Sequence, residues 1–408
     1  MQGHTVNIRY LEDIADDYNV SVTEITSSII IDELISFYNA YKFSCAKPRF
    51  AILVGNRNVI PYSSGVYGNS NNPESDFEYS LPYISLDSAY IRMRMAVGRW
   101  PVSRGDTTSL KNIINNILKF EETTAIYTNL SDLGIDIVTG SGNAENRFFE
   151  GGNEQRQILK NYHTHLYDGR QYYNCDYYTT IEHNFNNDEI WMLIYNGHGN
   201  LLGFDQPLCI NTSTISHLGT KFPPLVFGFA CSTNKNIFGK NWLSSNPNDK
   251  FGISGFWGAT TNAYLPYNNW LANQIFSHIS HRHIGDALVA GCQKFNNKER
   301  FNHMKRYVFM GDPALHTFGY NPNSFYYIQQ DNRDKDLRKP LVRIENQHLT
   351  IDLLSNNMQF YVYDIKGQLI CEGNNTSNNS YDTTDWMPGI YLIVISDGEK
   401  TYTQRVKK

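Results

Sequence analysis

One histidine and one cysteine each follow a short apolar run, and together they could form a nucleophilic pair. Residues 191–195 lead toward His198, and residues 225–230 lead into Cys231. In an open α/β sheet, functional groups collect outside the carboxyl ends of the strands. If the two runs are neighbouring strands, an imidazole and a thiol meet at one edge of the sheet. A thiolate attacks a carbonyl far better than a thiol does, and a nearby histidine is the base that forms it.

Glycines on both sides of the histidine allow a sharp turn and a close approach to a ligand. They are Gly197 and Gly199. The amides of Gly199 and Cys231 are therefore candidates for an oxyanion hole, whose donors stabilise the charge that develops on an attacked carbonyl. Taken singly, a cysteine after a strand is more often a buried apolar residue, and a histidine among glycines is often only a turn residue. The joint pattern favours chemistry.

The composition is that of a folded protein, and it excludes several classes of function. Of the 408 residues, 41% are hydrophobic and 18% are charged, with a formal net charge of −5. A nucleic-acid interface would need a strongly basic domain or stripe, which this sequence lacks. No apolar run approaches the roughly 20 residues of a membrane-spanning helix, and no secretory signal stands at the N-terminus. The 6 cysteines form no CxxC pair, so no zinc site is expected, and their spacings define no disulfides.

Alternating strands and helices are expected to position the two residues. Besides the two apolar runs, strands are expected at residues 50–55, 95–99, 135–138, 252–259 and 307–311, and helices at residues 22–42, 107–122, 154–162 and 270–279. Two loops are expected, one at the surface over residues 62–88, which are rich in Ser, Asn, Gly and Pro, and one over residues 139–152. This alternation predicts a largely parallel α/β sheet covered on both faces.

The pattern changes toward the C-terminus. Residues 319–340 are dominated by Asn, Gln, Asp, Arg and Lys, which is typical of a linker. From residue 341 onward, short strand-like runs are joined by the hairpin signals Lys366-Gly367 and Asp397-Gly398. These runs predict a small β-sandwich. The expected organisation is an N-terminal α/β subdomain (1–124), an α/β subdomain with the His/Cys pair (125–318), a linker (319–340) and a β-sandwich (341–408).

In its motifs the chain resembles the gingipain-type cysteine peptidases of the caspase-like fold group. That group has a His-Gly pair at the end of one strand and an Ala-Cys pair at the end of its neighbour, as in His198-Gly199 and Ala230-Cys231. Further matches lie at residues 51–55, 60–61, 96–99, 259–262 and 311–315, so the resemblance covers most of residues 5–318. It implies a caspase-like sheet-and-helix sandwich in two subdomains, and peptide hydrolysis through an acyl-thioester.

The resemblance also implies roles for individual residues. Cys231 would be the nucleophile, and His198 would be the general base or the proton donor to the leaving amine. In arginine-cleaving members an acidic residue forms the base of the specificity pocket, and Glu150 falls at that place, with Glu154 as a further match. Both glutamates imply a basic substrate residue at P1, directly before the scissile bond. The equal alternative to a pocket residue is a glutamate in a solvated loop. Tyr264 would cover the pocket, although an aromatic residue there could equally belong to the core.

Two departures from the family pattern bear on activity. A glutamate that assists the histidine in some members would lie near residues 139–142, where this chain has no carboxylate and where Ser141 is the alternative partner. The family also has a strand and a helix before the stretch that matches residues 6–15, plus a leader and a pro-segment, so the N-terminal subdomain is interpreted as truncated. No catalytic cofactor or metal is implied; structural calcium is allowed, but no contiguous ligand loop is present.

Residues 341–408 resemble the C-terminal sorting domain of proteins exported by the type IX (Por) secretion system of Bacteroidota. The matching stretches are residues 360–364, Gly367, residues 387–394 and the basic end at 401–408. The expected partners are therefore the secretion machinery and protein or peptide substrates, and the expected location is secreted or at the cell surface. The function predicted is a secreted cysteine endopeptidase. The alternatives left open are a sortase-like transpeptidase of the secretion system and a non-catalytic pseudopeptidase or surface adhesin.

Overall fold

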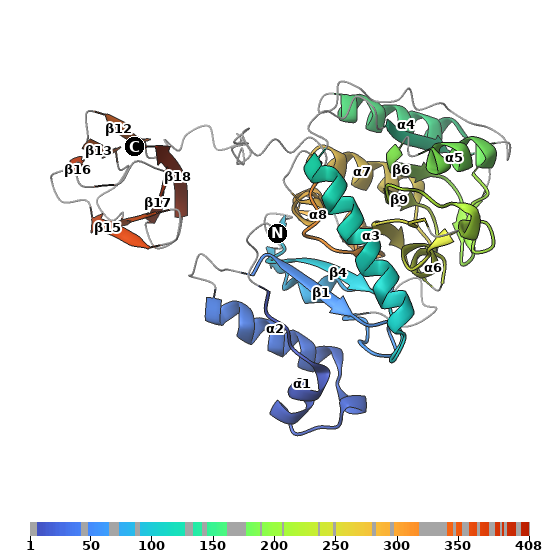
Figure 1. Ribbon diagram of the computed structural model, residues 1–408, viewed down its shortest axis with the longest axis horizontal. Coiled ribbons are helices and arrows are strands. Elements are labelled where there is room, and N and C mark those ends of the chain that lie inside the picture. Colours follow the sequence, from blue (N-terminus) through green and yellow to red (C-terminus); the bar gives the residue numbers. More distant parts are fainter. Residues whose placement is uncertain are drawn as a thin grey trace. The chain divides into compact units, whose positions relative to one another are not determined.

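The computed structural model forms two units, Met1–Phe325 and Tyr326–Lys408 (Figure 1). In the first it describes residues 6–41, 48–64, 73–85, 90–126, 134–140, 145–160, 177–187, 190–205, 208–235, 237–247, 250–279, 283–293 and 298–317. In the second it describes residues 341–345, 348–352, 359–364, 368–374, 380–383, 386, 390–396 and 401–407. The predicted linker, residues 319–340, lies outside the described residues.

A 7-stranded sheet forms the centre of the first unit. In spatial order its strands are β1 (Phe50–Val54), β4 (Ala96–Trp100), β11 (Tyr307–Gly311), β10 (Gly255–Ala259), β9 (Leu225–Phe229), β6 (Ile190–Asn196) and β5 (Gly134–Thr139). All neighbouring pairs are parallel except β10 with β11. Every residue of β5, β6, β9, β10 and β11 is buried, so both faces of the sheet are covered. The prediction of a largely parallel, doubly covered sheet is confirmed.

Two groups of helices cover the sheet. In one, α4 (Glu145–Lys160) packs on α7 (Leu265–Phe276), and α7 packs on α8 (Ile284–Cys292). In the other, α3 (Thr107–Ile126) and α5 (Tyr177–Asn186) pack against α6 (Phe238–Leu243). The Asn116 amide of α3 donates to the Leu243 carbonyl, and Phe185 of α5 stacks on Trp242 with ring centroids 5.6 Å apart. The smaller elements are α1 (Leu11–Asp17), α2 (Ser27–Tyr41), α9 (Lys298–Met304), β2 (Tyr83–Ser85), β3 (Tyr90–Arg92), β7 (Gly199–Asn200), β8 (Gly203–Phe204) and the 3-10 turns Val22–Glu24, Phe77–Ser80 and Ile215–His217.

Part of the segment predicted as a surface loop at residues 62–88 is buried instead. Within it, Asp76 accepts two hydrogen bonds from Arg99 at 2.6 and 2.8 Å, and the Arg99 side chain is only 1% exposed. The same guanidinium donates to the carbonyls of Gly55 and Ile60. The part of the segment around Asp76 is therefore held in the interior by an ion pair with a distant strand, which the surface-loop prediction missed.

The loop predicted at residues 139–152 is also wrong, because α4 already begins at Glu145. The two glycines that suggested a loop serve close packing in the helix. A Cβ on Gly151 would lie 2.3 Å from Asn269 Oδ1 of α7, and a Cβ on Gly152 would lie 2.6 Å from Thr139 Cγ2 of β5. Glu150 therefore lies within a helix.

The second unit is the predicted β-sandwich. One sheet contains β12 (Leu341–Glu345), β13 (His348–Asp352) and β16 (Ser380–Asp382); the other contains β15 (Leu369–Asn374), β14 (Gln359–Tyr363), β17 (Ile390–Ser396) and β18 (Thr401–Lys407). Leu349 of the first sheet packs with Phe360, Val362 and Ile393 of the second in one core. The antiparallel pairs β14–β15 and β17–β18 flank the two predicted hairpin signals, whose Lys366-Gly367 and Asp397-Gly398 lie outside the described residues. Among the described helices of both units, none is long and apolar enough to cross a membrane.

Candidate active site

The parallel pairing of β6 with β9 brings the two turns with the candidate residues to the same edge of the sheet. Asn196 at the end of β6 is opposite Phe229 at the end of β9, so His198 and Cys231 each lie two residues beyond a matched pair. Neighbouring strands are about 4.8 Å apart. The Gly197 amide continues the pairing by donating to the Phe229 carbonyl at 3.4 Å. The two turns therefore start side by side.

Beyond the strands, the turns stay in contact through Gly199. A Cβ built on this glycine would lie 2.9 Å from Ala230 Cβ, 3.0 Å from Thr233 Cγ2 and 3.1 Å from the Cys231 carbonyl oxygen. All three distances are shorter than ordinary contacts of a real side chain. Any residue larger than glycine would therefore push the histidine turn away from the cysteine turn.

Backbone and side-chain hydrogen bonds fix the histidine turn. The His198 carbonyl accepts from the Tyr195 hydroxyl at 2.8 Å and from the Asp205 amide at 3.1 Å. Burial raises the pKa of Tyr195 well above its usual value, which keeps this hydroxyl a donor. The side-chain amides of Asn196 and Gln155 exchange two hydrogen bonds at 2.8 and 3.0 Å, and both residues are buried. These hydrogen bonds thus fix the backbone on both sides of His198 from the interior of the fold.

The imidazole itself is accessible. His198 is exposed, and its ring lies edge-on to Phe148 of α4, with centroids 5.3 Å apart and an interplanar angle of 82°. This contact limits the ring on one side and leaves its nitrogens to solvent or to a ligand.

The thiol of Cys231 is half-buried and is held by one residue after β10. The Ala263 amide donates to Cys231 Sγ at 3.3 Å, and the thiol lies 3.4 Å from the Ala263 carbonyl. The next residue, Ser232, has φ of 55°, a left-handed conformation that is strained for a residue with a Cβ. Its amide donates to the Thr261 carbonyl at 3.0 Å. Among the described residues, the Cys231 amide has no hydrogen-bond acceptor.

The imidazole and the thiol are both described, and no hydrogen bond joins them here. Catalytic hydrogen bonds are commonly long without substrate and tighten when it binds. The arrangement can therefore supply a nucleophile, a base on the adjacent turn and a free backbone donor, which together suit acyl transfer.

A buried polar network supports the cysteine turn from below, and the sequence analysis missed it. Asn268 of α7 donates to the Phe229 carbonyl at 3.1 Å, and its Oδ1 accepts from the Tyr307 hydroxyl at 2.6 Å and from His303 Nε2 at 2.7 Å. Burial lowers the pKa of His303 to about 3, so the ring is neutral and can donate only once here. The available signal was Asn268 itself, a polar residue on the apolar face of the helix.

The predicted pocket residues have different surroundings. Glu150 is exposed on α4, on the side of the helix away from the buried Phe148. Glu154 is also exposed, and its Oε2 accepts from Asn273 of α7 at 2.6 Å. Tyr264 lies next to the thiol-binding Ala263; it is 50% exposed, and the Arg306 guanidinium lies 5.1 Å from its ring centroid. Ser141, the alternative partner for the histidine, is outside the described residues.

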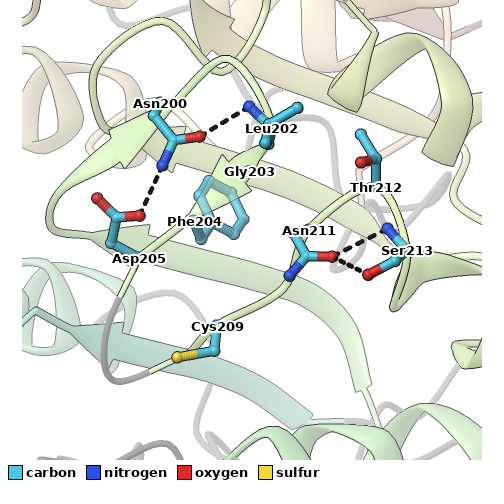
Figure 2. Close-up of a pocket in the computed structure, with 9 residues that line it drawn as sticks. All are labelled: Asn200, Leu202, Gly203, Phe204, Asp205, Cys209, Asn211, Thr212 and Ser213. Atoms are coloured by element: carbon cyan, nitrogen blue, oxygen red, sulfur yellow. Dashed lines mark hydrogen bonds between the residues drawn. The ribbon is translucent and has the colours of Figure 1, made fainter.

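A pocket of about 480 Å³ flanks the histidine turn (Figure 2). Its lining includes the β7–β8 turn and the following loop: Asn200, Leu202, Gly203, Phe204, Asp205, Cys209, Asn211, Thr212 and Ser213. The polar side chains largely bond to one another, as Asn200 does with Asp205 at 2.8 Å. His198 and Cys231 do not line it, so it is a neighbour of the site and not its centre.

The described cysteines differ in their bonding and burial. Cys231, Cys292 and Cys371 are free, and Cys209 is disulfide-bonded. Burial raises the pKa of Cys292 to about 12, which makes it unreactive near neutral pH. No group of three or more His, Cys, Asp or Glu side chains in the described part of the chain could hold a metal ion. Structural calcium therefore stays a prediction from the family resemblance.

Comparisons with known proteins agree with the motifs. Residues 1–318 match the model of Peptidase family C25, and residues 345–408 match the Secretion system C-terminal sorting domain. A search of curated protein sequences found no match.

Solved structures show the same fold. The structure of the Arg specific cysteine proteinase gingipain R is 17% identical, with a TM-score of 0.58, covering 97% of this chain and 94% of that one. The complex of Porphyromonas gingivalis RgpB pro- and mature domains is 16% identical, with a TM-score of 0.60, covering 98% and 93%. A structure described as a protease is 16% identical, with a TM-score of 0.56, covering 95% and 89%. The predicted caspase-like α/β fold is confirmed.

The contact at Gly199 gives a first prediction. Gly199→Ala should separate the two turns and slow the alkylation of Cys231 by iodoacetamide roughly tenfold or more, because a displaced base no longer assists the thiol. The rate is measured by mass spectrometry. The control is Gly105→Ala, at a φ of 79° with nothing within 4 Å; it should destabilise by about 1 kcal/mol and leave alkylation unchanged. Equal alkylation rates in all three proteins would contradict this account of the contact.

The buried imidazole gives a second prediction. The pKa of His303 is lowered from 6.5 to about 3, so below about pH 6.5 the unfolded chain binds a proton that the folded chain does not. This group therefore removes stability as the pH falls, by about 1–2 kcal/mol between about pH 7 and pH 5. His303→Gln can still donate to Asn268 but does not titrate. Over this pH range its free energy of unfolding, measured with urea, should fall by about 1–2 kcal/mol less than that of the parent protein. Parallel pH curves for the two proteins would show that the ring does not act this way.

Proposed function

This chain belongs to peptidase family C25, and on that premise we propose that it is an endopeptidase with a Cys231–His198 catalytic dyad. Membership of the family makes it a cysteine-type peptidase, a hydrolase. The observation that carries the assignment of the dyad is the contact between the two turns, in which Gly199 lies against Ala230 and the Cys231 carbonyl. A base and a nucleophile on rigid, touching turns are pre-organised for proton transfer.

The proposed reaction has two halves. His198 takes the thiol proton, and the Cys231 thiolate attacks the scissile carbonyl carbon, which forms a C–S bond and an oxyanion. The amides of Gly199 and Cys231 stabilise that oxyanion. As it collapses, the C–N bond breaks and the imidazolium gives its proton to the leaving amine. In the second half, His198 removes a proton from water, the hydroxide attacks the thioester, and the acid product and free thiol are released.

The state of the thiol supports this role. Cys231 is half-buried, while Cys292 is buried and Cys371 lies in the β-sandwich. Burial raises the pKa of the Cys292 and Cys371 thiols, and thiolates, not thiols, are nucleophiles. Within the described ranges the amide of Cys231 itself has no acceptor, which leaves it available to an oxyanion.

The sorting domain indicates where the enzyme works. Residues 345–408 direct the protein to type IX secretion, and so to the cell surface or the extracellular space. The disulfide at Cys209 agrees with an oxidising location. Protein or peptide substrates are thus met outside the cell.

A preference for a basic P1 residue is a second part of the proposal. It depends on Glu150, which the family resemblance places in the specificity pocket and which is exposed on α4. Glu150 has no ion-pair partner among the described residues, so its carboxylate is available to a substrate cation. Glu154 is engaged by Asn273 and is the weaker candidate.

The dyad predicts which thiol reacts with an active-site probe. A peptidyl chloromethyl ketone should modify Cys231, and Cys231→Ser and His198→Ala should each lower peptide hydrolysis by about a thousandfold or more. Cys292→Ser is the matched control and should keep full labelling and activity. Modification is located by peptide mapping. If Cys231 reacts no faster than Cys292, the chain has no activated nucleophile at this position and the dyad is wrong.

The P1 proposal has its own test. Glu150→Gln should lower kcat/KM for substrates with Arg or Lys at P1 by about tenfold relative to apolar P1 residues, since a desolvated charge pair is lost. Glu154→Gln should change the selectivity less, because that carboxylate already bonds to Asn273. A matched series of peptides differing only at P1 measures both. An unchanged selectivity in Glu150→Gln would remove Glu150 from the specificity pocket.

A further inference from the structure

The segment that holds the thiol, residues 260–264, lies beyond the last residue of β10. Ala263, whose amide and carbonyl contact Cys231 Sγ, lies past the end of β10. The contacts that fix residues 260–264 therefore matter for the reaction, because a displacement of this segment by about an ångström moves the nucleophile.

Arg306, directly before β11, contacts this segment at several points. Its carbonyl accepts from the Thr260 amide at 2.7 Å and from the Thr260 hydroxyl at 3.2 Å. Its guanidinium Nη1 donates to the Asn262 carbonyl at 2.7 Å and stacks on the Tyr264 ring at 5.1 Å. These contacts lie on both sides of Ala263, so a single residue, Arg306, fixes the segment that binds the thiol.

The charge of Arg306 is unusual for a buried arginine. The residue is only 8% exposed, and no carboxylate in the described part of the chain is ion-paired or hydrogen-bonded to it. The other deeply buried arginine, Arg99, has Asp76 as a two-point partner, and the neighbouring Lys305 pairs with Glu78. Buried charges are normally paired, so we expect an anionic group near the Arg306 guanidinium.

The groups that interact with the Arg306 charge lie at the active site. Burial lowers the pKa of Arg306, and the phenols of Tyr264 and Tyr307 and the thiol of Cys231 raise it; Arg306 in turn adds to the lowering of the pKa of His303, which stays neutral. The Tyr307 hydroxyl donates to Asn268 and its pKa is raised far above neutral by burial, so it carries no charge there. In the proposed reaction, Cys231 is the group among these that becomes an anion, as the thiolate.

We infer that Arg306 is a positioning residue for the nucleophile: it fixes the Asn262–Tyr264 segment, and its positive charge stabilises the Cys231 thiolate. This inference rests on the proposed function, since it takes Cys231 as the nucleophile. In this arrangement Ala263 donates a hydrogen bond to the sulfur, Arg306 holds Ala263 in place, and His198 transfers the proton. Other titratable groups around the thiol are His198 on the turn after β6, Tyr264 and Tyr307; Lys235 on the cysteine turn interacts with Glu74.

The test is the pH dependence of Cys231 alkylation by iodoacetamide in the full chain. Arg306→Gln should move the midpoint of the rate–pH curve upward by about one pH unit, which lowers the rate near neutral pH about tenfold. Arg306→Lys keeps the charge but not the forked contacts, so its midpoint should move by less than half as much while kcat falls. A purely structural role would lower the rate at every pH without moving the midpoint.

A matched control is available on α9. Arg300 also stacks on an aromatic ring, with its guanidinium 5.0 Å from the Trp270 centroid, and Arg300→Gln should leave the midpoint unchanged. Arg306→Met is a second neutral variant in case Gln is not tolerated at the buried site, and circular dichroism establishes which variants fold. An unmoved midpoint in a folded neutral variant would overturn the role of Arg306. An unreactive Cys231 in the parent protein would instead overturn the proposed function.

Discussion

The parallel register of β6 with β9 is the constraint on which the candidate site depends. Because Asn196 faces Phe229, the turns after both strands start at one level and His198 and Cys231 share an edge of the sheet. A slip of one residue would turn every side chain of the strand to the other face and separate the imidazole from the thiol. The buried apolar side chains of both strands hold the register, and Gly199 allows the turns to touch.

Behind this edge, several polar side chains are buried among apolar and aromatic residues. Gln155 holds Asn196 at the end of one strand, and Asn268 holds the Phe229 carbonyl at the end of the other. Such groups destabilise a core unless they are bonded, and these make two or three hydrogen bonds each. They are best explained as supports that lock the two turns, since reacting groups need fixed geometry more than extra stability.

The sequence predicted the parts that depend on local pattern. The apolar runs located β6 and β9, and the glycines and the apolar-to-polar change located both turns. It failed where contacts between distant residues decide the outcome. The loop around Asp76 was predicted at the surface because its partner, Arg99, is distant in the chain, on β4. Gly151 was predicted in a loop because its neighbour, Asn269, is on another helix. The sequence around Arg306 indicated no role for it, because its contacts arise only where β11 passes beside the segment after β10.

In the proposed dyad, the imidazole of His198 and the sulfur of Cys231 face each other closely enough to act on one substrate carbonyl. A short bifunctional alkylating agent, dibromoacetone, tests this directly, because it reacts first with a thiolate and then with a nucleophile within a few ångströms. Peptide mapping of the treated protein should find the peptides of Cys231 and His198 joined through the reagent. Modification of Cys231 alone, with His198 unmodified under the same conditions, would contradict the account.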